Sequence, residues 1–126
     1  MSVTPGDLLA EAKALRVAAR GSEARCRTVI GRAYYAAYHA LSQAAATAGY
    51  RYATENNRPP GSHENLIHWC RSQKTIPALK MAGRILADIK TWRVRADYKL
   101  ADPVTYDITM VCLDNAQALI DDLAPA

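Results

Sequence analysis

The sequence predicts an all-α protein, a single up-and-down antiparallel bundle of four to five helices. Alanine supplies 24 of the 126 residues, and alanine has the highest helix propensity but fills the face of a sheet poorly. Apolar residues recur at helical spacing everywhere except in one stretch, and no segment alternates convincingly as a strand does. A chain of this length is the size of one domain. Residues 1–126 are therefore expected to form one unit, with its core at about 7–123 and a loop at about 50–61.

Helix-capping and helix-breaking residues define five expected helices, at about 5–20, 22–48, 62–71, 77–100 and 105–123. Thr4 can cap the first of these helices with its hydroxyl, and Pro5 suits the first helical position after it. Gly21 ends that helix, and Gly49 ends the second because glycine readily adopts the left-handed conformation of a helix terminus. The first two helices are thus expected to be joined by a very short turn.

The only long loop precedes the third helix, where asparagines, prolines and a glycine over 56–61 disfavour both helix and strand. Ser62 is expected to cap the third helix, and Pro77 to begin the fourth. The pair Asp102 and Pro103 breaks the chain before the last helix. No internal repeat is present.

Charge and cysteine content restrict the class of protein only mildly. The net charge is +4 with a pI near 9.1, which favours an anionic partner without establishing nucleic-acid binding. Three dispersed cysteines without C-x-x-C spacing indicate reduced, buried thiols rather than a disulfide framework or a zinc site. No secretory signal opens the chain and no run is long and apolar enough to span a bilayer, so we expect a cytoplasmic protein without a membrane partner.

The second expected helix carries two different faces when its residues are projected at about 100° per residue. One face is small and apolar and is expected to pack against neighbouring helices: Cys26, Val29, Ile30, Ala33, Ala36, Ala37, Ala40, Leu41 and Ala44. The opposite face is polar and holds Arg25, Thr28, Arg32, Tyr35, His39 and Gln43. Arginine binds phosphate and histidine titrates near neutral pH, which is the combination that phosphodiester cleavage requires. Taken alone, the same pattern is more typical of a solvated surface with a hydrogen-bonded histidine.

Three tyrosines cluster on this helix, at positions 34, 35 and 38, although the chain has no phenylalanine. A tyrosine ring can pack while its hydroxyl stays hydrated. These rings are expected to fill a seam of the bundle or a homodimer interface more readily than to stack on bases. A homodimer through this helix is therefore expected.

The fourth expected helix places Arg93 within an apolar stripe that also contains Met81, Ala82, Ile85, Leu86, Ile89, Trp92, Ala96 and Leu100. A buried charge without a partner is very costly, so Arg93 must be paired or must serve an anion. Asp97, four residues further, is the expected intrahelical partner. The surrounding segment is basic on several sides, which suits solvent as well as a phosphate backbone: its basic residues are Arg84, Lys90, Arg95 and Lys99.

A metal site is not expected. His63 and His68 lie five residues apart rather than four, and no third ligand accompanies them. The chain also lacks a glycine-rich phosphate loop and a nucleophile elbow. No cofactor is predicted.

Two segments of the chain resemble the HEPN-domain family. The run Gly31-Arg32-Ala33-Tyr34-Tyr35-Ala36-Ala37-Tyr38-His39-Ala40-Leu41 is similar to that family's second-helix signature, and Trp92-Arg93-Val94-Arg95-Ala96-Asp97-Tyr98 is similar to the end of its fourth helix. With the Ser62-His63-Glu64-Asn65-Leu66 helix start, the likeness extends over 7–123. It implies a helical bundle that usually dimerises and is often encoded beside a minimal nucleotidyltransferase in toxin–antitoxin or defence loci.

Many members of that family are metal-independent ribonucleases whose motif is an arginine, four to six residues, and a histidine. Arg93 matches the arginine, but Tyr98 stands where the histidine is expected. A tyrosine with an ordinary pKa near 10 is a poor general base at neutral pH. Arg32 and His39 have the required spacing, on the helix that carries the tyrosine signature instead.

Three interpretations follow. In the first, the protein is a HEPN-type RNA-directed toxin or defence ribonuclease, with Arg93 and His39 as catalytic candidates. The RNA- or nucleotide-binding candidates are Arg32, Tyr35, Arg95, Asp97, Tyr98 and Lys99. In the second, it is a non-catalytic HEPN module that binds nucleotide or RNA, or docks a nucleotidyltransferase. In the third, it is a structural dimerisation bundle only.

Overall fold

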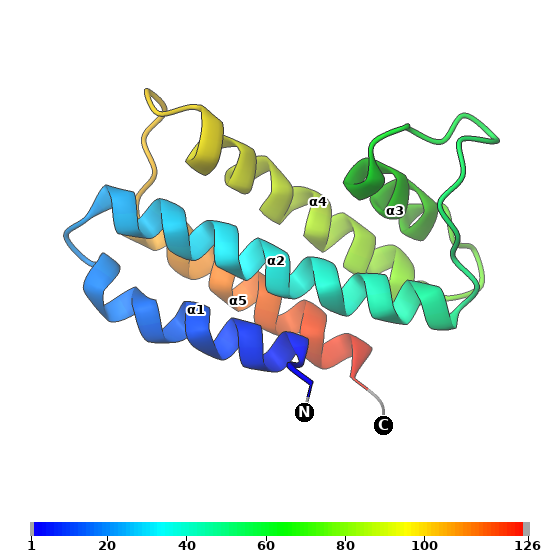
Figure 1. Ribbon diagram of the computed structural model, residues 1–126, viewed down its shortest axis with the longest axis horizontal. Coiled ribbons are helices and arrows are strands. Elements are labelled where there is room, and N and C mark those ends of the chain that lie inside the picture. The colour runs from blue at the N-terminus through cyan, green and yellow to red at the C-terminus, as the bar shows by residue number, and fades with distance from the viewer. Residues whose placement is uncertain (1, 125–126) are drawn as a thin grey trace.

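The computed structural model describes residues 2–124, and this part of the chain contains helices and no strand. In chain order the helices are α1 (Pro5–Ala19), α2 (Glu23–Thr47), α3 (Ser62–Arg71), α4 (Pro77–Tyr98) and α5 (Tyr106–Leu123). Figure 1 shows α1, α2, α4 and α5 running alternately in opposite directions along the long axis. The predicted all-α bundle is confirmed. Within the described range no helix is long and apolar enough to cross a membrane.

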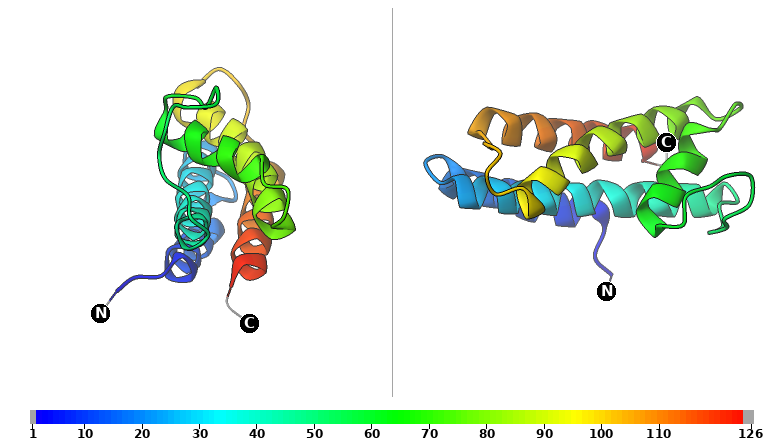
Figure 2. Two further views of the ribbon diagram at one scale, coloured as in Figure 1. Left: turned by 90° about the vertical axis from the view of Figure 1, so that its right-hand side faces the viewer. Right: turned by 90° about the horizontal axis from the view of Figure 1, so that it is seen from above.

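The shorter helix α3 does not join the antiparallel set. It lies between the C-terminal half of α2 and the first half of α4, as the view from above in Figure 2 shows. Its contact with α4 is close: a Cβ atom on Gly83 would come within 3.1 Å of the Cys70 Cβ and of the Arg71 backbone nitrogen. The missing side chain of Gly83 therefore allows α3 to pack directly on α4.

Most of the predicted helix starts are confirmed. The Thr4 hydroxyl accepts a hydrogen bond from the Asp7 backbone N–H at 3.1 Å, and the Asp7 carboxylate accepts one from the Thr4 N–H at 2.9 Å. These reciprocal bonds form a capping box, which satisfies two backbone donors at the helix start. One predicted cap is wrong, because Gly61 and not Ser62 is the N-cap residue of α3.

The core is built around α2, and the two predicted faces of this helix are confirmed. Its apolar face is buried apart from a half-buried Ala44, while every residue of its polar face is exposed. Alanine side chains on the buried face allow the neighbouring helices to approach closely. All three cysteines are buried and free, as predicted. Two members of the predicted apolar stripe of the fourth helix are not buried: Met81 is 50% exposed, and Leu100, which lies beyond the end of α4, is 74% exposed.

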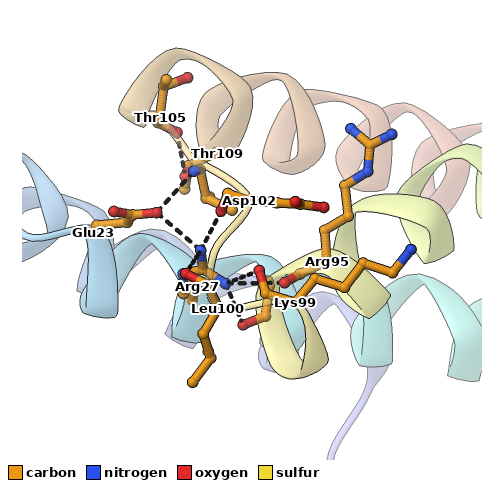
Figure 3. A network of polar contacts seen from close by, with 10 residues as sticks. Glu23, Arg27, Arg95, Lys99, Leu100, Asp102, Thr105 and Thr109 are labelled. Atoms are coloured by element: carbon orange, nitrogen blue, oxygen red, sulfur yellow. Dashed lines mark hydrogen bonds and ion pairs between the residues drawn. The ribbon is translucent and has the colours of Figure 1, made fainter.

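Arg27 holds the end of α4, a role that the sequence did not reveal. Its guanidinium donates hydrogen bonds to the carbonyl oxygens of Arg95 at 2.9 Å and Ala96 at 3.0 Å, and further ones to Lys99, Leu100 and Asp102 (Figure 3). The last carbonyls of a helix have no partner within it, and they carry the negative end of its dipole. A largely buried cation there stabilises the end of α4, which lies at Tyr98 and not at the predicted Leu100.

Glu23 extends this network to the last helix. Its carboxylate forms an ion pair with Arg27 at 2.9 Å and accepts a hydrogen bond from the Val104 N–H at 2.9 Å. The start of α2, the end of α4 and the segment that leads into α5 are thus fastened at one end of the bundle (Figure 3).

The predicted loop, 50–61, is tied to α3 by one fully buried polar side chain. Asn65 accepts a hydrogen bond from the Tyr50 hydroxyl at 2.8 Å and donates to the carbonyl oxygens of Ala53 and Pro59, at 2.5 and 2.8 Å. A buried amide needs such partners. These bonds fix the position from which α3 begins.

Candidate functional site

Four aromatic side chains occupy two turns of α2 and form the base of the candidate site. Tyr34 is fully buried, Tyr35 is 43% exposed, and His39 lies on the exposed face. The ring centroid of Tyr34 is 5.9 Å from that of Tyr35 and 6.3 Å from that of Tyr38. Residues three and four positions apart share one side of a helix, so the tyrosine-rich motif presents a continuous strip of rings.

His63 reaches this strip from α3. Its ring stacks on Tyr38 with centroids 4.2 Å apart and planes 13° apart, and it also stacks on Tyr34 at 5.6 Å. Its Nδ1 is 2.7 Å from the Tyr34 hydroxyl. We call the five residues Tyr34, Tyr35, Tyr38, His39 and His63 the aromatic cluster.

Arg93 reaches the same cluster from α4. Its guanidinium carbon lies 5.5 Å from the ring centroids of both Tyr34 and Tyr35, and 5.7 Å from that of Tyr98. Its Nη2 donates a hydrogen bond of 3.3 Å to the Tyr35 hydroxyl. A cation over aromatic faces is stabilised by the ring quadrupoles. The structure therefore brings Arg93, Tyr35 and Tyr98, three predicted site residues, together.

Asp97 is the partner of Arg93, as predicted from the spacing. Its carboxylate lies 3.0 Å from Nε of Arg93, and the Arg93 side chain is only 16% exposed. The contact is an ion pair without hydrogen-bond geometry, so the buried Nε–H has no hydrogen-bond acceptor among the described residues. The Asp97 carboxylate also lies over Gly31 of α2, 3.7 Å from where a Cβ atom would stand. The ion pair therefore sits at the contact of α2 with α4.

Burial and nearby charges shift the pKa values of two residues of the aromatic cluster. Burial raises the pKa of Tyr34 well above its ordinary value, with only partial opposition from the positive charge of Arg93. Burial also lowers the pKa of His63, and the charges of Arg93 and Lys90 lower it further against the opposing effect of Glu64. Tyr34 is consequently a phenol and His63 a neutral imidazole at neutral pH.

The other predicted binding residues lie apart from Arg93. Arg95 follows it by two positions, which is about 200° around a helix, and its guanidinium carbon is 4.8 Å from the ring of Trp92. Arg95 and Lys99 line a shallow groove of about 400 Å³ between α3 and α4, together with Glu64 and Lys90. Glu64 and Lys90 form an ion pair of 2.5 Å in this groove. Arg95 and Lys99 could contact an anion there, but at a different surface.

The remaining candidates on α2 are exposed. Arg32 forms no hydrogen bond or ion pair with any described residue. The ring of His39 lies 6.5 Å from that of Tyr35 and 5.5 Å from that of Tyr38. His39 is therefore an exposed member of the aromatic cluster, whereas Arg32 lies about one turn before Tyr35 and outside the cluster.

The sequence does not predict His63 as part of this site: its spacing from His68 does not suit a metal, and it otherwise belongs to the helix start that resembles the HEPN family. A fully buried tyrosine indicates that some partner must satisfy its hydroxyl, but the identity of that partner depends on where α3 packs. Within the described range, no three His, Cys, Asp or Glu side chains are grouped as a metal ion would require. The site consists of one cation, one carboxylate, two imidazoles and phenol rings.

Comparison with known proteins does not place the chain in a family: no family model matches it, and no curated protein or solved structure matches it significantly. The functional argument therefore depends on the residues of the site.

Proposed function

We propose that this chain is an RNA-directed protein of the HEPN type, with metal-independent ribonuclease chemistry at Arg93. The observation that carries the proposal is the unused hydrogen-bonding capacity of this arginine. A guanidinium has five N–H donors, yet Arg93 donates one hydrogen bond among the described residues, to Tyr35. A phosphodiester offers the oxygen acceptors that these donors lack.

The surroundings of Arg93 also suit RNA. Tyr35 and Tyr98 flank the guanidinium and are 43% and 70% exposed, so their rings can stack on unpaired bases. His39 and His63 belong to the same cluster, and an imidazole ring is a group that can accept a proton from a substrate. Tyr98 occupies the position of the expected motif histidine, so a histidine of the aromatic cluster must provide the chemistry.

A cleavage assay tests this proposal. Labelled single-stranded RNA is incubated with the protein in the presence of EDTA, which removes the contribution of metal ions. We expect cleavage by the wild type and its loss in Arg93→Ala, because a single phosphate contact by arginine in a partly buried site contributes about 1–3 kcal/mol. Arg51→Ala, an exposed loop variant, is the matched control. RNA cleavage that persists in Arg93→Ala would contradict the proposal.

The ion pair of Arg93 with Asp97 favours a second candidate function, a non-catalytic HEPN module. Asp97 occupies one edge of the guanidinium, and Tyr98 is not a histidine. Such a module would bind nucleotide or RNA, or dock a minimal nucleotidyltransferase of a toxin–antitoxin or defence locus. Under this alternative, Arg93→Ala weakens RNA binding although the wild type cleaves no RNA at high protein concentration.

The same surface supports a proposed homodimer. Exposed aromatic side chains around a partly buried cation are typical of interface centres, and Tyr35 and Tyr98 provide them here. Sedimentation of the wild type and of Tyr98→Ser tests the dimer: the wild type should have twice the mass of one chain.

Three free buried thiols fit a reducing compartment, and we propose a cytoplasmic location.

A further inference from the structure

We infer that His63, and not His39, is the residue that takes a proton from the substrate at Arg93. The inference rests on the proposed ribonuclease function and adds a catalytic residue to it. The juxtaposition that carries it is a histidine from α3 stacked on Tyr34 and Tyr38 of α2, with Arg93 of α4 over the ring of the same Tyr34.

The first argument is orientation, because a group that transfers protons must be held in a productive geometry. The His63 ring is fixed by its stacking on Tyr38 at 4.2 Å and by the hydrogen bond of Nδ1 with the Tyr34 hydroxyl at 2.7 Å. His39 is exposed, and its nearest aromatic neighbour lies at 5.5 Å between ring centroids. His39 forms no hydrogen bond with a described residue through its ring. Of these two histidines, only His63 has a ring whose orientation is fixed by its neighbours.

The second argument is which ring nitrogen a substrate can reach. Nδ1 faces a tyrosine that is fully buried, while the His63 residue as a whole is partly exposed. Nε2 forms no hydrogen bond within the described part of the chain. Because the two nitrogens lie at different edges of the ring, the Nε2 edge is the one left for a ligand. Tyr34 then acts as the positioning residue that holds Nδ1.

The third argument is protonation. The charged and titratable groups that face His63 come from three helices: Glu64 on its own helix, Tyr34, Tyr35, Tyr38 and His39 on α2, and Lys90 and Arg93 on α4. Burial and the two cations favour the neutral ring. A neutral imidazole beside a cation that binds phosphate is the arrangement that a general base requires.

The proposed step balances without a metal or a redox partner. The 2′-hydroxyl oxygen of a nucleotide attacks the adjacent phosphorus as its O–H bond breaks, and the proton passes to Nε2 of His63. The bond from phosphorus to the 5′ oxygen breaks, and this oxygen takes a proton from water. His63 returns its proton to the resulting hydroxide. The products are a 2′,3′-cyclic phosphate and a 5′-hydroxyl.

The test compares His63→Gln with His68→Gln, which replaces a half-buried histidine about 140° further around the same helix. Single-turnover cleavage of labelled RNA in EDTA is measured from about pH 5 to pH 8, together with RNA binding by fluorescence anisotropy. We expect His63→Gln to slow cleavage by about 100-fold or more and to change the binding constant by less than about threefold. His68→Gln should match the wild type. The acid limb of the rate profile, which reports protonation of the base, should disappear in His63→Gln.

A second variant distinguishes the loss of a catalytic group from a loss of folding. His63→Gly leaves space for free imidazole, and added imidazole should restore cleavage, which no loss of packing alone would allow. The inference is overturned if His63→Gln and His63→Gly cleave at the wild-type rate, or if imidazole restores nothing while the variant remains folded and binds RNA. It is also overturned if His39→Gln alone abolishes cleavage. Absence of RNA cleavage by the wild type overturns the proposed ribonuclease function itself.

Discussion

The fully buried hydroxyl of Tyr34 lies 2.7 Å from Nδ1 of His63, so that α2 and α3 share a polar contact within an aromatic stack. Tyr34→Phe removes this hydrogen bond but keeps the ring. We expect the free energy of unfolding to fall by about 1 kcal/mol, the usual contribution of one such bond. Urea denaturation measures this change. Tyr38→Phe is the control, because the Tyr38 hydroxyl has no hydrogen-bond partner among the described residues.

The lowered pKa of His63 makes stability depend on pH. Below its ordinary pKa of 6.5 the unfolded chain binds a proton at this histidine, whereas the folded chain does so only at lower pH. Protons therefore favour the unfolded state, and the free energy of unfolding should fall as the pH drops from about 7 to about 5. Because the ring is partly exposed, the effect is modest.

Comparison of the wild type with His63→Gln isolates this contribution. Between about pH 7 and about pH 5, the free energy of unfolding should fall less in the variant than in the wild type. Denaturation at several pH values measures this difference. Direct titration of the ring by NMR should give a pKa below 6.5, and Arg93→Gln should raise it. A pKa of His63 above 6.5 in the wild type would contradict the prediction.

Arg27 should contribute more to stability than an exposed arginine of the same helix. Its side chain is 11% exposed and serves the carbonyl oxygens that end α4, so Arg27→Met would leave several of them without a donor. We expect a loss of about 2–4 kcal/mol in the free energy of unfolding. Arg32→Met, an exposed position on the same helix, should change it by less than about 0.5 kcal/mol. Equal effects of the two substitutions would show that the carbonyl contacts contribute nothing.

The contrast between Arg27 and Arg93 shows what the sequence could predict. Arg93 was identified because its helical spacing places it within an apolar stripe, and Asp97 because it lies one turn further; both follow from local geometry. Arg27 binds carbonyl groups about 70 residues away in the chain, and helical periodicity carries no information about such a partner. His63 escaped prediction for the same reason. The helices could be read from caps, glycines and prolines, whereas the packing of α3 over the tyrosines could not.

Asp97 should oppose anion binding at Arg93. Its carboxylate lies 3.0 Å from Nε of Arg93, so a phosphate must share the guanidinium with a negative charge. Asp97→Asn removes that charge while keeping the size of the side chain. We expect RNA to bind about 3- to 10-fold more tightly, which corresponds to about 1 kcal/mol, as measured by fluorescence anisotropy at low salt. Asp88→Asn removes one negative charge at an exposed position of the same helix and controls for net charge. If both variants bind RNA more tightly by the same factor, the increase in affinity reflects overall charge. If Asp97→Asn binds RNA more weakly than the wild type, the carboxylate orients Arg93 rather than competing with phosphate for it.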